Sequence, residues 1–84
     1  MSRLGLKIVG SFMGNCLLIR DNKTNKDIEI MAMQLNGIIK SDRSTGSLPH
    51  GGWDKDGEKI TIYHDDDRAK HEVTFTMQEL GELI

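Results

Sequence analysis

Two histidines and a run of acidic residues lie close together in the second half of the chain. His64 is followed directly by Asp65, Asp66 and Asp67, and His71 comes shortly after them. Imidazole nitrogens and carboxylate oxygens bind zinc and other divalent ions. His64, Asp66 and His71 are therefore candidate metal ligands. Their spacing matches no standard ligand motif, however, and the sequence favours a polar turn in which they bind no metal.

The single cysteine, Cys16, is the candidate nucleophile. It lies in an apolar run, where a thiol is usually buried and unreactive. No pattern pairs it with a histidine, and the hydroxyl-rich residues 41–47 lack the motif that surrounds a catalytic serine. The glycines of residues 46–57 also lack the spacing of phosphate-binding loops. We therefore predict a protein without enzymatic activity and without a cofactor.

Residues 41–58 show no hydrophobic period and contain the only tryptophan of the chain. An irregular segment longer than about 12–15 residues is uncommon inside a compact domain and is usually functional or disordered. We therefore predict a long flexible loop here. Trp, Tyr and Arg are typical anchors of protein interfaces. The candidate partner-binding residues are Trp53, Arg43 and His50 in this loop and Tyr63 on the outer face of the segment that follows it. The alternative for Trp53, which we favour, is a place in the core.

The elements that position these residues begin with a β-hairpin at residues 59–77, where apolar and polar residues alternate on both sides of a polar turn. Pairing His64 with His71 places Ile62 opposite Val73, and one face of the hairpin is then apolar. The same alternation predicts a second hairpin at residues 4–20. Its turn is expected at residues 13–15, because Gly and Asn accept positive φ readily.

Residues 28–39 fit two interpretations. Apolar residues recur at helical spacing across the segment, and Thr24 with Asp27 has the spacing of a helix-capping box. They also alternate in two short runs, which a strand with a bulge near Met31 explains. Gly37 destabilises a helix by about 1 kcal/mol relative to Ala. We favour the strand and keep the helix as the alternative.

The last residues of the chain have helical spacing, and Thr76 with Glu79 has capping-box spacing. Together the elements predict a mainly β fold, with a β-rich α+β fold as the alternative. We expect a small antiparallel sheet or sandwich of about five strands with a short C-terminal helix. Residues 1–84 form one domain in this interpretation.

The charge balance argues against nucleic-acid binding. Lys and Arg number 11 against 13 Asp and Glu, for a net charge of −2, whereas nucleic-acid binders usually carry a basic excess. A single cysteine cannot form an internal disulfide, which is typical of a reducing compartment. No segment approaches the roughly 20 apolar residues that span a membrane. We therefore expect a cytoplasmic protein without a nucleic-acid or membrane partner.

These observations favour a non-enzymatic protein-interaction domain. A chain of 84 residues has a marginal core, so the first alternative is a self-assembling structural protein, such as a virion or assembly protein, that forms homo-oligomers. The second is a metal-dependent enzyme or metal-binding switch at His64 and His71. In size and mild acidity the chain is similar to accessory proteins of bacteriophages and mobile elements. That similarity implies a protein that binds or inhibits a host protein.

Overall fold

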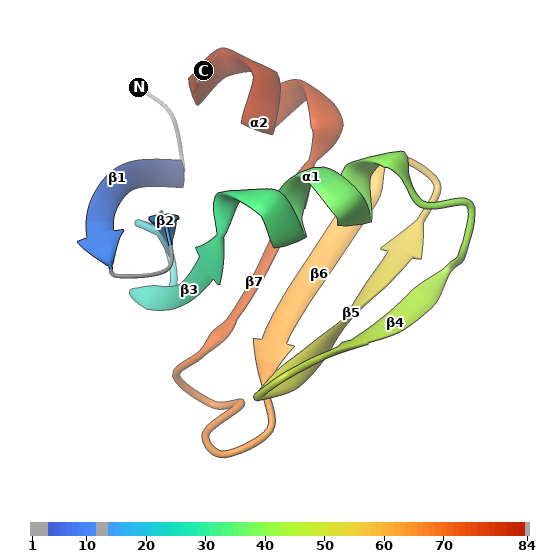
Figure 1. The fold of residues 1–84 in the computed structure, drawn as a ribbon. Helices are drawn as coiled ribbons and strands as arrows, with labels where there is room; N and C mark the ends of the chain where they lie inside the picture. The colour runs from blue at the N-terminus through green and yellow to red at the C-terminus, as the bar shows by residue number, and fades with distance from the viewer. Residues whose placement is uncertain (1–3, 12–13, 84) are drawn as a thin grey trace.

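The computed structural model describes residues 4–11 and 14–83, which form seven strands and two helices (Figure 1). In chain order the elements are β1 (Leu4–Ser11), β2 (Gly14–Asp21), β3 (Lys26–Met31), α1 (Ala32–Lys40), β4 (Thr45–Leu48), β5 (Gly51–Asp56), β6 (Lys59–His64), β7 (Glu72–Thr76) and α2 (Met77–Leu83). The strands make two antiparallel sheets, β1-β2-β3 and β4-β5-β6-β7. The mainly β class with a short C-terminal helix is confirmed, although the sheets contain more strands than expected.

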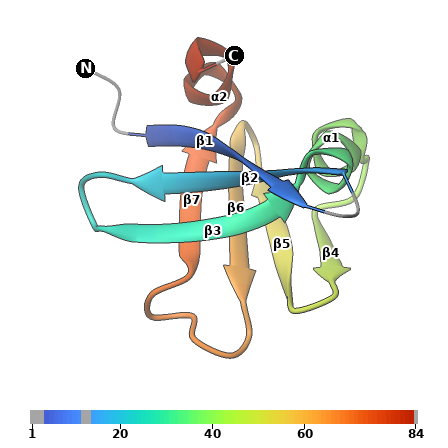
Figure 2. The ribbon, with the colours of Figure 1, turned by 60° about the vertical axis from the view of Figure 1, so that its left-hand side comes forward.

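The two sheets pack face to face, and the strands of one run across those of the other (Figure 2). The core lies between them, and both helices contribute to it. Its buried members are Leu4, Ile19, Ile28, Ile30, Leu35, Ile38, Trp53, Ile60, Ile62, Val73, Phe75 and Leu80. No helix within residues 4–11 and 14–83 is long and apolar enough to cross a membrane.

Both predicted hairpins are present. In the N-terminal hairpin Leu6 pairs with Ile19, as the alternation requires. In the C-terminal hairpin Ile62 pairs with Val73, and the His64 N–H donates to the His71 carbonyl over 2.9 Å, so the predicted register is confirmed. The turn predicted at residues 13–15 is wrong for residues 14–15, which belong to β2. Residue 13 lies outside the described residues.

The C-terminal helix begins with the predicted capping box. The Thr76 N–H donates to Glu79 Oε1 over 3.0 Å, and the Glu79 N–H donates to Thr76 Oγ1 over 3.1 Å. These two bonds satisfy backbone donors that the first turn of a helix leaves unpaired. Leu80 then points into the core, at 2% exposure.

The strand prediction for residues 28–39 is wrong after Met31, where α1 begins. Leu35 and Ile38, which lie at helical spacing, are both buried. Burying two such side chains contributes about 1.5–3 kcal/mol each, which outweighs the helix penalty of about 1 kcal/mol for Gly37. The expected cap at residues 24–27 does not form. Instead the Met31 N–H donates to Gln34 Oε1 over 3.2 Å.

The loop prediction for residues 41–58 is wrong for the part that forms β4 and β5. This hairpin lacks a hydrophobic alternation because glycine stands where a side chain would face an aromatic ring. A Cβ atom at Gly46 would collide with the Trp53 ring, and one at Gly52 would collide with the Tyr63 ring. Each ring therefore lies across a glycine of the neighbouring strand, an arrangement that compensates for the missing side chain.

Candidate functional site

The register of the C-terminal hairpin brings the two predicted histidines together, with 5.5 Å between their ring centroids. Both side chains contact β3 in the other sheet. His71 Nδ1 lies 3.1 Å from Asp27 Oδ1 and also from the Asp27 carbonyl oxygen. His64 Nε2 lies 3.4 Å from the carbonyl oxygen of Glu29. The pair therefore links the end of the hairpin to β3.

The third predicted metal ligand does not join this pair. Asp66 is exposed in the turn between β6 and β7. Across the residues that the structure describes, no group of three or more His, Cys, Asp or Glu side chains is arranged to hold a metal ion. His64 and His71 instead make contacts to β3 that join the two sheets.

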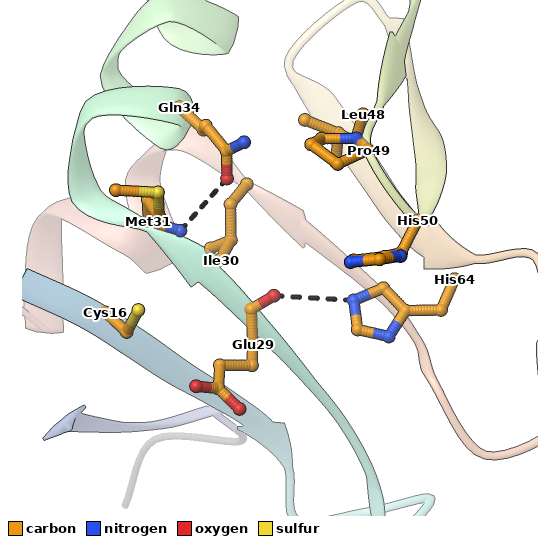
Figure 3. A pocket seen from close by; sticks show the side chains of 9 residues that line it. All are labelled: Cys16, Glu29, Ile30, Met31, Gln34, Leu48, Pro49, His50 and His64. Atoms are coloured by element: carbon orange, nitrogen blue, oxygen red, sulfur yellow. Dashed lines mark hydrogen bonds between the residues drawn. The ribbon is translucent and has the colours of Figure 1, made fainter. Parts of the chain in front are cut away.

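A groove with a volume of about 300 Å³ opens between β3 and the turn that joins β4 to β5. We call it the β3 groove. Its lining residues are Cys16, Glu29, Ile30, Met31, Gln34, Leu48, Pro49, His50 and His64. Figure 3 shows residues of β2, β3 and α1 on one side and residues 48–50 with His64 on the other. The groove thus lies where the edge of one sheet faces a hairpin of the other sheet.

The backbone edge of β3 along the groove is largely occupied. The Asp27 N–H donates to the Lys70 carbonyl over 3.2 Å. Further along, the Glu29 carbonyl contacts His64, and the Met31 N–H donates to Gln34. An added strand would have to displace these bonds, so the edge is protected against strand addition. The groove is consequently suited to receive side chains.

The charged groups at the groove are acidic. Glu29 is exposed, and no Lys or Arg is among the described residues that line the groove. The Asp65 N–H donates to the His50 carbonyl over 2.8 Å, which places the acidic turn beside the groove. We call Glu29, whose carboxylate points away from residues 48–50 (Figure 3), and the exposed turn residues Asp65 and Asp66 the acidic rim.

Arg68 directly follows the three aspartates of the acidic turn, but its side chain contacts residues outside the groove. Its Nε lies 2.9 Å from Glu72 Oε2, and its guanidinium lies over the Tyr63 ring at 4.0 Å from the centroid. The hydrogen bond to Glu72 raises the pKa of Arg68 above its ordinary value. This cation therefore belongs to the outer face of the second sheet and not to the groove.

The four predicted partner-binding residues lie in different places. Trp53 is 7% exposed and belongs to the core, which agrees with the favoured alternative. Tyr63 lies beneath Arg68, and Arg43 is exposed in the segment after α1. His50 alone lines the β3 groove.

Sequence reasoning missed most of the groove. Met31 belongs to the predicted strand and Pro49 to the predicted loop, but no motif links them, and only the packing of the two sheets brings them near one another. One signal was present, since Leu48-Pro49-His50 stands between Gly46 and Gly51, and proline with glycine is typical of a hairpin turn.

Comparison with known proteins gives no relative, because no model of a protein family, no curated protein and no solved structure matches the chain. The geometry and charge of the β3 groove are therefore the basis for a functional assignment.

Proposed function

We propose that the protein is a non-enzymatic protein-interaction domain that receives a segment of a partner protein in the β3 groove. The supporting observation is an open groove with largely apolar walls, formed by residues from both sheets. Ligand pockets usually measure about 300–1,000 Å³. At about 300 Å³ the groove suits one or two side chains of a larger partner better than a whole small molecule.

The arrangement of reactive groups in the groove favours binding over catalysis. A cysteine nucleophile needs a base within hydrogen-bonding distance, about 2.6–3.2 Å. Cys16 lies at one end of the groove, and His50 and His64 lie at the other (Figure 3). His64 is also directed to the carbonyl oxygen of Glu29. This separation supports a groove that binds without covalent chemistry.

Protein interfaces derive most of their binding energy from a few central residues. We expect Met31, Pro49 and His50 to have this role, because they line the groove and are not part of the buried core. Trp53 contributes to folding instead. We expect the partner in the cytoplasm, since a single cysteine is typical of proteins in a reducing compartment.

A matched pair of methionine substitutions tests the proposal. Met31 lines the groove, whereas Met33 is 81% exposed at the start of α1 and lies outside it. Partner proteins captured from the producing cells by wild-type protein should bind Met31→Ala about tenfold or more weakly. Binding to Met33→Ala should equal that of wild type. Equal binding by both variants, or capture of no protein, would contradict the proposal.

Self-association is the second candidate, and one observation favours it. Ile8 is 66% exposed on β1, which is an edge strand. Lys7 is exposed on the same strand, and a lysine on an edge strand opposes pairing with another copy. Sedimentation across a concentration series separates the two candidates. A dimer that Ile8→Lys dissociates would support assembly, and a monomer at every concentration would exclude it.

A further inference from the structure

We infer that the partner segment in the β3 groove carries a Lys or Arg side chain next to an apolar one. This inference rests on the proposed function, and it names the chemistry of the occupant. Two features of the groove support it together: apolar walls and an acidic rim without a lining cation.

The apolar part of the occupant follows from the walls. Ile30 and Met31 form the side that belongs to β3, and Leu48 and Pro49 form the opposite side. Ile30 is 3% exposed and packs in the core, which holds its side chain in place in this wall. A Leu, Ile, Val or Met side chain placed between these walls would be shielded from water on both sides, and this burial of apolar surface would favour binding.

The cationic part follows from the charges at the rim. Among the described residues that line the groove, Glu29 alone is an Asp, Glu, Lys or Arg. Asp65, whose N–H donates to the His50 carbonyl, is exposed, as is its neighbour Asp66. Glu29 has no side-chain hydrogen bond among residues 4–11 and 14–83. A lysine or arginine of the occupant can therefore pair with carboxylates that make no ion pair with the described residues.

The nearby basic groups do not cancel this field. Arg68 is paired with Glu72, and Arg20, which lies diagonally across from Glu29 on β2, donates to Asn25 Oδ1 over 3.1 Å. Asp27 is next to His71. An acidic peptide or a nucleic-acid phosphate would meet like charge at the rim, which disfavours both.

Selection from a phage-displayed library of random 12-residue peptides on immobilised wild-type protein tests the inference. Peptides that bind wild type and lose binding to Met31→Ala are taken as groove ligands. We expect them to share a Lys or Arg adjacent to a branched apolar residue. Their synthetic forms should bind more weakly as salt concentration rises, because the charge contact is exposed.

Charge variants of the rim give the second measurement. Glu29→Lys should weaken the selected peptides about tenfold, and Asp65→Asn with Asp66→Asn should weaken them about threefold. The controls are Glu58→Lys, and Asp42→Asn with Asp56→Asn, since all three residues are exposed and outside the groove. Circular dichroism of each variant establishes that it is folded.

The outcomes separate the inference from the proposed function. Groove ligands that lack a basic residue, or that bind Glu29→Lys as well as wild type, would overturn the inference while the proposed function stands. A selection that yields no peptide sensitive to Met31→Ala would overturn both.

Discussion

At the scale of single residues, the position of the Trp53 ring requires a glycine at position 46. The ring packs into the core and occupies the position that a Gly46 side chain would need. A tryptophan in a segment without hydrophobic period looked like part of a flexible loop. The pairing of β4 with β5 places Gly46 opposite Trp53, and the sequence does not show which glycine lies beside the ring. This hairpin could therefore not be predicted from alternation.

Alanine at two glycines should have opposite effects on stability. Gly46→Ala introduces a Cβ against the Trp53 ring and should lower the free energy of unfolding by about 1–3 kcal/mol. Gly37→Ala meets nothing within 4 Å on α1 and should raise it by about 0.5–1 kcal/mol, because alanine restricts the unfolded chain. Urea denaturation measures both. Equal effects would show that Trp53 does not lie across Gly46.

At the scale of elements, the sequence predicted the two long hairpins because each has an apolar face with period two. The register of the second hairpin also predicted that His64 and His71 are neighbours, which the structure confirms. The segment after Met31 was misassigned because β3 passes into α1 without a polar linker. The spacing of the buried residues therefore changes from that of a strand to that of a helix within one continuous apolar run.

The two capping boxes weighed from the sequence can be told apart by experiment. Thr76→Ala removes the bond from the Glu79 N–H to Thr76 Oγ1 and should lower the free energy of unfolding by about 0.5–2 kcal/mol. Thr24 is exposed, and its hydroxyl oxygen accepts only a long bond of 3.4 Å from the Lys26 N–H. Thr24→Ala should change stability by less than about 0.5 kcal/mol. A larger loss for Thr24→Ala in thermal or urea unfolding would contradict this assignment of the cap.

For the whole molecule, the crossing of the two sheets is what creates the β3 groove. Met31 comes from the end of one sheet, and Pro49 comes from a turn of the other. Neither residue belongs to a sequence motif, and their proximity depends on contacts between β3 and the β6–β7 hairpin, including that of Asp27 with His71. The site as a whole was therefore beyond prediction from the sequence, although three of its lining residues, Cys16, His50 and His64, were singled out there for other roles.

Mapping a bound peptide on the protein tests the central claim most directly. Addition of a display-selected peptide to ¹⁵N-labelled protein should shift the amide signals of residues 29–34, 48–52 and 64–65, which surround the β3 groove. Signals of the outer face of the second sheet, such as Thr61 and Thr74, should stay in place. Shifts concentrated on that outer face, or around Ile8 on β1, would show that the protein binds its partner elsewhere.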